Sequence, residues 1–498
     1  MHRLFAKTYH TGIIDTPFGH KYYVNADFTA TGSPYKPIEK FISNNVLQYY
    51  ANTHSNAHNG KLMSHYIEQS KSIIRSCTNA HEDDKIIFTG NGCTGAIIHL
   101  IHALNLKQEL TPKAVVFLSV SEHHSNYLPW THLPVDLEII SVQQNGQINL
   151  TELTKKMQMY SDRPLKICSF IAGSNVTGVL QPTIELARVA HQHGFLIMFD
   201  YAAIAPYIPI NIHTDSASYY DAVYISPHKF LGGPGSSGVL IANSKLFVNQ
   251  VPFCPGGGTV RFVCKKFQVY SDDIESRETG GTPNIIGCIR AGLAFQLKNR
   301  LQEYITAREQ EIHDLVEPRL REIPNIKLIN PKCCHAVPIY SIIIDNLHYN
   351  FIVVLLNDIF GIQTRGGVSC CSVFAQHLLK IKHPQQMYIY NEIVSNHGVP
   401  PDYGWCRVTF HYIMPNYVIE YIVSAIEYVA KYGQLFLPYY EYLPEKNNWI
   451  SIGWKHDFPE LDYDPQPTAA ATATALKKEY LDTQLSDAQY ILTKLIIK

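Results

Sequence analysis

Four polar residues in the first half of the chain end or closely follow short apolar runs. They are His123, Asn175, Asp200 and Lys229. A lysine amine forms Schiff bases with carbonyl compounds, and an aspartate in a low-dielectric pocket can keep a heterocyclic nitrogen protonated. Taken singly, such an aspartate is more often a helix cap or turn residue, and such a lysine is more often a surface residue. Their chemical interpretation depends on whether the fold brings them together.

The apolar runs around these residues are short, nearly continuous, and rich in β-branched and aromatic residues. They cover residues 86–88, 114–120, 166–172, 195–199, 222–225 and 238–242. Such runs are typical of strands that helices cover on both faces. Residues 183–193 read as a crossover helix that stops at Gly194. The pattern predicts an α/β fold with a mostly parallel sheet, whose carboxyl-terminal strand ends are where ligands bind.

A glycine-rich segment, residues 89–95, precedes a helix that we expect to extend to about Leu104. Amide groups at the start of a helix suit a phosphate dianion. By itself, the segment is more typical of an ordinary glycine-rich turn.

The second half of the chain predicts a smaller α+β unit after a long helix over residues 297–323. We therefore expect a large domain over residues 20–295. A small C-terminal domain over residues 296–433 should include the N-terminal segment 1–19. Residues 434–498 form a Tyr- and Pro-rich irregular strap and a helical appendage, which includes the low-complexity segment 468–476.

The composition excludes several classes of protein. The 498 residues include 41 Lys plus Arg and 42 Asp plus Glu, so a net charge of -1 argues against nucleic-acid or anionic-membrane binding. The sequence contains no apolar run of 18 residues, the length typical of a membrane span. The 11 cysteines show no zinc-finger spacing and no secreted disulfide pattern, so we expect no metal and a reducing, cytoplasmic location.

Seven segments, in their order along the chain, together resemble the class V aminotransferase family of pyridoxal phosphate (PLP) enzymes. Within it, they are most similar to the cysteine desulfurase and selenocysteine lyase branch. The segments are residues 122–126, 174–178, 199–200, 226–229, 281–284, 365–370 and 406–410. The resemblance covers about residues 20–430 and implies the PLP-dependent transferase fold of type I, with a large domain and a smaller α+β domain.

The resemblance assigns the first four residues to the cofactor ring. It implies that Lys229 forms the Schiff base, that Asp200 pairs with the ring nitrogen, that His123 stacks on the ring and that Asn175 bonds the ring hydroxyl. The phosphate contacts implied by the family pattern are Ser226, His228, Cys93 and Thr94, with Thr282 reaching the cofactor of a neighbouring subunit. The last contact implies a homodimer.

The same resemblance assigns residues to the substrate, expected to be cysteine or a similar amino acid. Arg407 would clamp its carboxylate through a planar two-donor fork, and His58 would lie in a loop at the pocket mouth. Cys370 would be the nucleophile that receives the sulfur, helped by the positive charge of Arg365. A buried structural thiol is the alternative for Cys370, and the adjacent Cys371 is a second candidate.

Two departures from the desulfurase pattern leave the reaction open. Ala203 stands where the family usually has Gln, and Ser369 stands where it usually has His. The leading hypothesis is a lyase or sulfur transferase that breaks a Cβ–S or Cβ–Se bond and passes sulfur to a possible acceptor protein. The second is an aminotransferase in which Cys370 is structural. The third is a catalytically degenerate scaffold that binds a partner through the strap and C-terminal helix.

Overall fold

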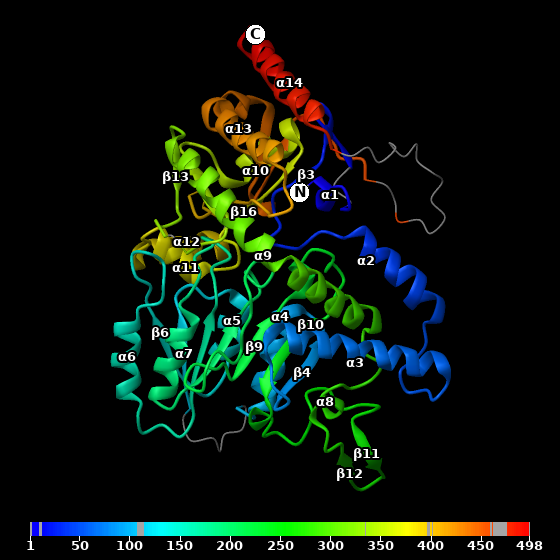
Figure 1. The fold of residues 1–498 in the computed structure, drawn as a ribbon. Coiled ribbons are helices and arrows are strands. Elements are labelled where there is room, and N and C mark those ends of the chain that lie inside the picture. Colours follow the sequence, from blue (N-terminus) through cyan, green and yellow to red (C-terminus); the bar gives the residue numbers. More distant parts are fainter. Residues whose placement is uncertain are drawn as a thin grey trace. The chain divides into compact units, whose positions relative to one another are not determined.

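The computed structural model describes residues 2–8, 12–106, 114–333, 335–395, 399–400, 402–458, 461 and 476–497. The chain forms two compact units (Figure 1). The large unit contains residues 29–307 and 331–337, and the small unit contains residues 1–28, 308–330 and 338–498. The long helix α9 (Ile285–Glu322) begins in the large unit and continues into the small one from Arg308.

A seven-stranded sheet forms the centre of the large unit. Its order is β4 (Asp84–Thr89), β10 (Gly238–Asn243), β9 (Ala222–Ile225), β8 (Leu196–Asp200), β7 (Lys166–Ile171), β5 (Val115–Ser119) and β6 (Asp136–Ile140). The strand pairs from β9 to β6 are parallel, whereas β10 runs antiparallel to both of its neighbours. The predicted α/β fold with a mostly parallel sheet is thereby confirmed. Strand β6 was not expected, because this half-buried strand has no continuous apolar run.

Helices of the large unit pack on this sheet and build its core. Helix α4 (Gly92–Ala103) packs against β4, β9 and β10, and α7 (Thr183–Gln192) packs against β8. The remaining helices are α2 (Lys36–Phe41), α3 (His58–Thr78), α5 (His124–Thr131), α6 (Leu150–Met159) and α8 (Ile274–Arg277). Buried side chains such as Leu100, Leu118 and Trp130 fill the space around α4. This packing fixes the start of α4 near the carboxyl ends of the strands.

The small unit is built on a four-stranded antiparallel sheet. Its order is β13 (Ile326–Leu328), β14 (Ile339–Ile344), β17 (Trp405–Thr409) and β16 (Arg365–Gly367). Its helices are α1 (His2–Phe5), α10 (Tyr349–Phe360), α11 (Ser372–Leu378), α12 (His383–Ser395), α13 (Asn416–Tyr432) and α14 (Lys478–Ile497). An N-terminal hairpin, β1 (Ile13–Thr16) and β2 (Gly19–Tyr22), precedes β3 (Val24–Asn25), which pairs with β15 (Ile362–Gln363).

Residues 434–458 are more regular than the sequence predicts. They contain a hairpin of β18 (Tyr440–Leu443) and β19 (Asn448–Ser451), and the Tyr440 hydroxyl donates to Asp358 at 2.8 Å. Helix α14 belongs to the same unit, where Gln484 bonds the Tyr421 hydroxyl. The strap is thus less irregular than expected, because tertiary hydrogen bonds supply order that local periodicity does not reveal, and the expected helix of the appendage is present as α14. Most of the low-complexity segment, residues 468–475, lies outside the described residues.

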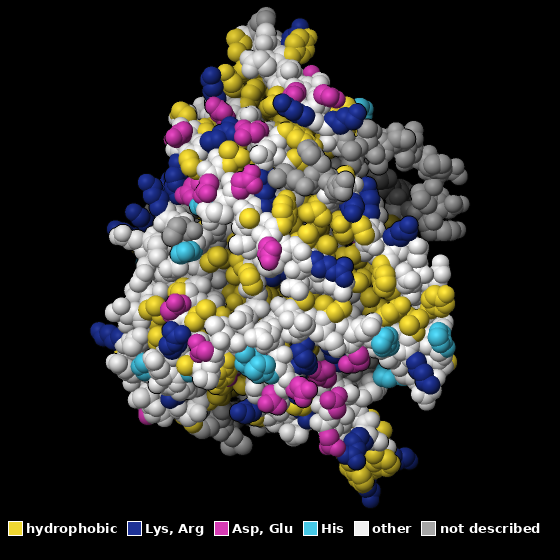
Figure 2. Space-filling view, in the orientation of Figure 1, with side chains coloured by type: hydrophobic (Ala, Val, Ile, Leu, Met, Phe, Trp, Pro, Cys, Tyr) yellow, Lys and Arg dark blue, Asp and Glu magenta, His cyan; other side chains and the backbone are white. Residues whose placement is uncertain are grey.

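Another hairpin, β11 (Val260–Val263) and β12 (Gln268–Tyr270), belongs to the large unit. Figure 2 shows apolar and basic side chains gathered on it. Phe262, Val263 and Phe267 are each more than half exposed. Within the described part of the chain, no helix is both long and apolar enough to cross a membrane.

Candidate active site

Lys229 lies in a tight loop that follows strand β9. Ser226 leaves the strand, and a 3-10 turn over Pro227–Lys229 brings the Lys229 amide to the Ser226 carbonyl at 3.0 Å. The loop closes on Gly233, where a Cβ atom would lie 1.8 Å from the Pro227 carbonyl oxygen. Only glycine can lie this close to the Pro227 carbonyl, so the glycine at position 233 is what allows the loop to be compact.

Asp200 ends strand β8 and is only 2% exposed. Its register partner on β9 is Tyr224, two residues before Ser226. The Ala202 amide donates to Asp200 Oδ1 at 2.8 Å. Burial raises the pKa of Asp200, whereas the positive charge of Lys229 opposes that rise. The predicted meeting of Asp200 and Lys229 at one edge of the sheet is therefore observed.

The start of helix α4 lies beside the same strand ends. Gly92 adopts φ +55°, and a Cβ atom there would lie 2.6 Å from Ser226 Oγ. The Cys93 amide donates to that oxygen at 2.9 Å, and Thr94 Oγ1 is 2.7 Å from Ser125 Oγ. The N-cap residue Asn91 makes no side-chain cap hydrogen bond, and the Ser226 hydroxyl binds an amide of the first turn instead, so this helix start and the neighbouring hydroxyls form a cradle suited to an anion.

Two histidines and an asparagine complete this group. His123 caps α5, its Nδ1 accepting from the Ser125 amide at 3.1 Å. His228 Nδ1 lies 3.2 Å from Thr31 Oγ1. Burial and the charge of Lys229 lower the pKa of His228 to about 4, so its ring is neutral near pH 7. Asn175 is 5% exposed in the turn after β7.

Thr282 and His58 also belong to the large unit. Thr282 Oγ1 accepts from Asn52 Nδ2 at 2.8 Å, and His58 is the exposed first residue of α3. Their assigned roles remain predictions.

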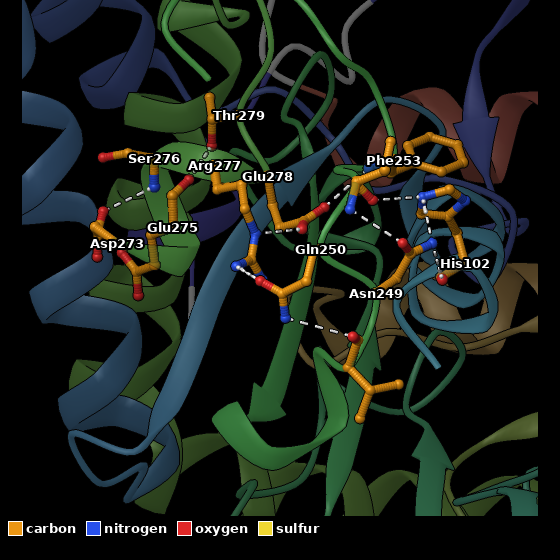
Figure 3. A network of polar contacts seen from close by, with 12 residues as sticks. His102, Asn249, Gln250, Phe253, Asp273, Glu275, Ser276, Arg277, Glu278 and Thr279 are labelled. Atoms are coloured by element: carbon orange, nitrogen blue, oxygen red, sulfur yellow. Dashed lines mark hydrogen bonds and ion pairs between the residues drawn. The ribbon is translucent and has the colours of Figure 1, made fainter. Parts of the chain in front are cut away.

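A buried polar network anchors the chain just before the Thr282 segment (Figure 3). Glu278 Oε2 accepts from the Phe253 amide at 3.0 Å and lies 2.9 Å from His99 Nε2 on α4. Arg277 Nε donates to the other carboxylate oxygen at 3.3 Å. Further along α4, His102 lies 3.1 Å from Asn249 Nδ2. The network ties the segments around residues 249–253 and 273–279 to the helix whose start forms the cradle. No sequence motif predicts it.

Arg365 and Arg407 belong to the small unit. They are register partners on β16 and β17, so their side chains share one face of the sheet. Arg407 is 2% exposed, and its Nη2 donates to Asp27 Oδ1 at 2.6 Å. Asp27 was missed by sequence reasoning, because 380 residues separate it from Arg407 and no motif includes it.

Cys370 lies in the loop that follows β16. Arg365 Nη2 donates to Cys370 Sγ at 3.3 Å. Ser369 and Cys370 both adopt left-handed backbone angles, with φ of 55° and 57°, and the Trp405 indole donates to Ser369 Oγ at 3.1 Å. Cys370 is half-buried, whereas Cys371 is fully buried. The sequence leaves both Cys370 and Cys371 as candidates for the nucleophile. Cys370 is the more accessible of the two, and its sulfur has Arg365 as a cationic neighbour.

Glu122 precedes His123 and is buried, although the sequence pattern assigns it no role of its own. Its Oε1 accepts from Ser119 Oγ at 2.6 Å and from the Ile171 amide at 2.9 Å. Its Oε2 accepts from Asn126 Nδ2 at 2.7 Å. Burial raises the pKa of Glu122 to about 8, despite these hydrogen bonds, and the negative charge of Asp200 adds to the rise.

Comparisons with known proteins agree with this arrangement. The sequence model of the family named aminotransferase class-V matches residues 24–415. A probable cysteine desulfurase of Borreliella burgdorferi is 26% identical over 402 residues, 76% of this chain and 90% of that protein. Another from Methanothermobacter thermautotrophicus is 26% identical over 425 residues, 82% of this chain and 96% of that protein.

Solved structures show the same fold. A cysteine desulfurase from Thermococcus onnurineus, determined in its apo form, superposes with a TM-score of 0.70 at 23% identity, covering 82% of this chain and 95% of that one. The cysteine desulfurase CsdA of Escherichia coli gives 0.64 at 22% identity, covering 82% and 94%. The expected PLP-dependent transferase fold of type I is confirmed.

The raised pKa of Glu122 predicts a pH-dependent stability. Unfolded Glu122 loses its proton near its usual value of 4.5, whereas the folded residue keeps it up to about pH 8. The free energy of unfolding should therefore fall as the pH rises between these values. Glu122→Gln keeps the shape of the side chain and stays neutral at every pH. In this variant the free energy of unfolding, measured by urea unfolding across this pH range, should lack a decrease of a few kcal/mol that the wild type shows. Glu82→Gln, at an exposed position, is the matched control. An unchanged pH profile in Glu122→Gln would contradict the prediction.

Proposed function

Because the chain belongs to the aminotransferase class-V family, we propose that it is a PLP-dependent enzyme that removes sulfur from cysteine and releases alanine. The observation that carries the desulfurase assignment is the Arg365 contact to Cys370, at 3.3 Å on an accessible loop. Relatives that align over most of their own length are named cysteine desulfurases, which supports the same reaction.

The residues around Lys229 fit PLP. In this proposal Lys229 holds it covalently, Asp200 pairs with its ring nitrogen, His123 stacks on the ring and Asn175 bonds the ring hydroxyl. The phosphate contacts are assigned to Ser226, His228, Cys93 and Thr94, and the start of α4, where the N-cap residue Asn91 makes no side-chain cap, supports that assignment. When bound, PLP supplies an electron sink for negative charge at the substrate Cα.

The protein side chains divide the remaining work. Asp200 is a buried carboxylate that stabilises positive charge beside it, and Lys229 moves the proton at the substrate Cα. Arg407 binds the substrate carboxylate with a planar donor fork. His58 stays assigned to the pocket mouth. The neutral His228 ring can share a hydrogen bond with a phosphate oxygen without adding charge.

Cys370 performs the sulfur transfer. Its thiolate attacks the sulfur of the substrate, so that an S–S bond forms while the Cβ–S bond breaks. The electron pair of the broken bond stays with Cβ, which takes up a proton and yields alanine. The enzyme keeps the sulfur as a Cys370 persulfide, and a thiol of an acceptor protein then removes it. Arg365 holds positive charge at the sulfur throughout.

An aminotransferase is the second candidate. Ala203 and Ser369 replace the Gln and His of the desulfurase pattern, and these two departures favour it. Ala203 is 3% exposed and offers no side-chain donor, while Ser369 Oγ accepts from the Trp405 indole. In this alternative Cys370 is structural.

The proposed location is the cytoplasm. Every cysteine in the described part of the chain is free, as is usual in a reducing compartment.

The cofactor assignment makes a direct prediction. Purified wild-type protein should be yellow, and borohydride reduction followed by peptide mapping should find the cofactor on Lys229. Lys229→Ala should lose the covalent link. Asp200→Asn should keep the cofactor but lose most of its turnover, because a neutral amide does not hold the ring nitrogen protonated. Lys166→Ala, at the far end of β7, is the control and should retain colour. Reduced cofactor on another lysine would refute the assignment.

The sulfur-transfer step predicts a distinct phenotype for Cys370→Ala. This variant should still bind cysteine, seen as a change in the absorption spectrum of the enzyme, but should release no alanine and carry no persulfide. Alanine is measured by chromatography and persulfide by mass spectrometry. Buried Cys371→Ala is the matched control and should keep the reaction. Equal alanine release from wild type and from both variants would support the aminotransferase instead.

The proposal also includes a homodimer in which Thr282 reaches the cofactor of the second subunit. The exposed apolar side chains of the β11–β12 hairpin, in the same unit as Thr282, support such an interface. Light scattering should give twice the chain mass of 56.4 kDa. A fully active monomer would contradict this part of the proposal.

A further inference from the structure

The guanidinium proposed to bind the substrate carboxylate already holds a carboxylate of the chain itself. Arg407 Nη2 donates to Asp27 Oδ1 at 2.6 Å, a distance typical of a strong charge-assisted hydrogen bond. The two side chains are 2% and 12% exposed, so water screens the pair weakly. Asp27 therefore interacts with Arg407 in the way a substrate carboxylate would.

The backbone around Asp27 is held from several sides. The Asp27 amide donates to Asn25 Oδ1 at 2.8 Å. The Ala26 amide donates to the Gln363 carbonyl at 2.9 Å, and the Thr409 amide donates to the Ala26 carbonyl at 2.8 Å. These bonds keep the Asp27 Cα beside β15 and β17. The carboxylate would therefore leave Arg407 by rotation of the Asp27 side chain.

The second arginine does not relieve this competition. Arg365 is the cross-strand partner of Arg407, and it donates to Cys370. A substrate carboxylate at Arg407 would either displace Asp27 or lie next to it, and two neighbouring carboxylates repel each other in a poorly hydrated site. Both outcomes weaken the binding of the substrate.

We propose that Asp27 is an internal competitor for Arg407 and so determines how tightly the site holds the carboxylate of its amino-acid substrate. The inference rests on the proposed function only in assigning the substrate carboxylate to Arg407. Asp27 acts through Arg407 and is a specificity-determining residue outside the reacting atoms. It keeps the buried guanidinium paired when the site is empty and makes release of the product easier.

The test compares two ligands on the purified, full-length holoenzyme. L-alanine carries the carboxylate, and ethylamine is the same amine without it. Isothermal titration calorimetry should show that Asp27→Asn binds L-alanine about tenfold more tightly than wild type, while the affinity for ethylamine is unchanged. Asp27→Glu, which keeps the charge, should bind L-alanine less tightly than Asp27→Asn does. Asp15→Asn is the matched control, because Asp15 is exposed in the N-terminal hairpin and pairs with exposed His20.

An Asp27→Asn protein with equal or weaker affinity for L-alanine would overturn the proposal, and a weaker affinity would show that Asp27 orients Arg407 instead. Circular dichroism checks that the variant is folded, and Asp27→Ser replaces it in the same titration if it is not. The titration measures the binding of L-alanine and does not depend on the desulfuration of cysteine. Tighter L-alanine binding in a protein that does not desulfurate cysteine would keep the role of Asp27 and remove the proposed function. Unchanged L-alanine binding in Asp27→Asn, in a protein that does desulfurate cysteine, would remove the role of Asp27 and keep the proposed function.

Discussion

The buried carboxylate of Asp200 is the group on which the chemistry of the large unit depends. A carboxylate that is 2% exposed is disfavoured as an anion unless hydrogen bonds and positive charge oppose the loss of water. The Ala202 amide and Lys229 provide that opposition. Lys229 reaches this place because β9 lies next to β8 in the sheet and because Gly233 allows a tight loop after it.

The field of Asp200 extends to its neighbours. Burial is the main cause of the raised pKa of Cys93 at the start of α4, of Glu122 before α5 and of Tyr224 on β9, and the negative charge of Asp200 adds to each rise. A positive group beside Asp200 would reduce its share of this cost. The proposed PLP, a protonated heterocycle with an anionic substituent, would supply such a group, which is a physical argument for the proposed cofactor.

The sequence predicted the parts of this arrangement that depend on local pattern. Continuous apolar runs predicted the buried strands, and the residues at their ends predicted the meeting of Asp200, Lys229 and the α4 start. Contacts between distant segments left no such pattern. The Arg407–Asp27 pair joins residues 380 apart, and the Glu278 network joins α4 to a loop nearly 180 residues later. The C-terminal hairpin was missed for the same reason, whereas a helix near the C-terminus was expected; the hydrogen bonds by which Tyr440 and Gln484 join the hairpin and α14 to the body of the small unit left no pattern in the sequence.

The small unit places two positive charges side by side. Two guanidinium groups on the same face of adjacent strands repel each other, and a hydrogen-bond acceptor at each group reduces that repulsion. Asp27 supplies a carboxylate at Arg407, and the Cys370 sulfur accepts a hydrogen bond from Arg365. Ser369 and Cys370 hold left-handed conformations that cost about 1 kcal/mol or more each, so the rest of the loop must compensate for keeping the sulfur at Arg365. In the proposed reaction, the substrate carboxylate and the Cys370 sulfur would therefore each meet one arginine of the same pair.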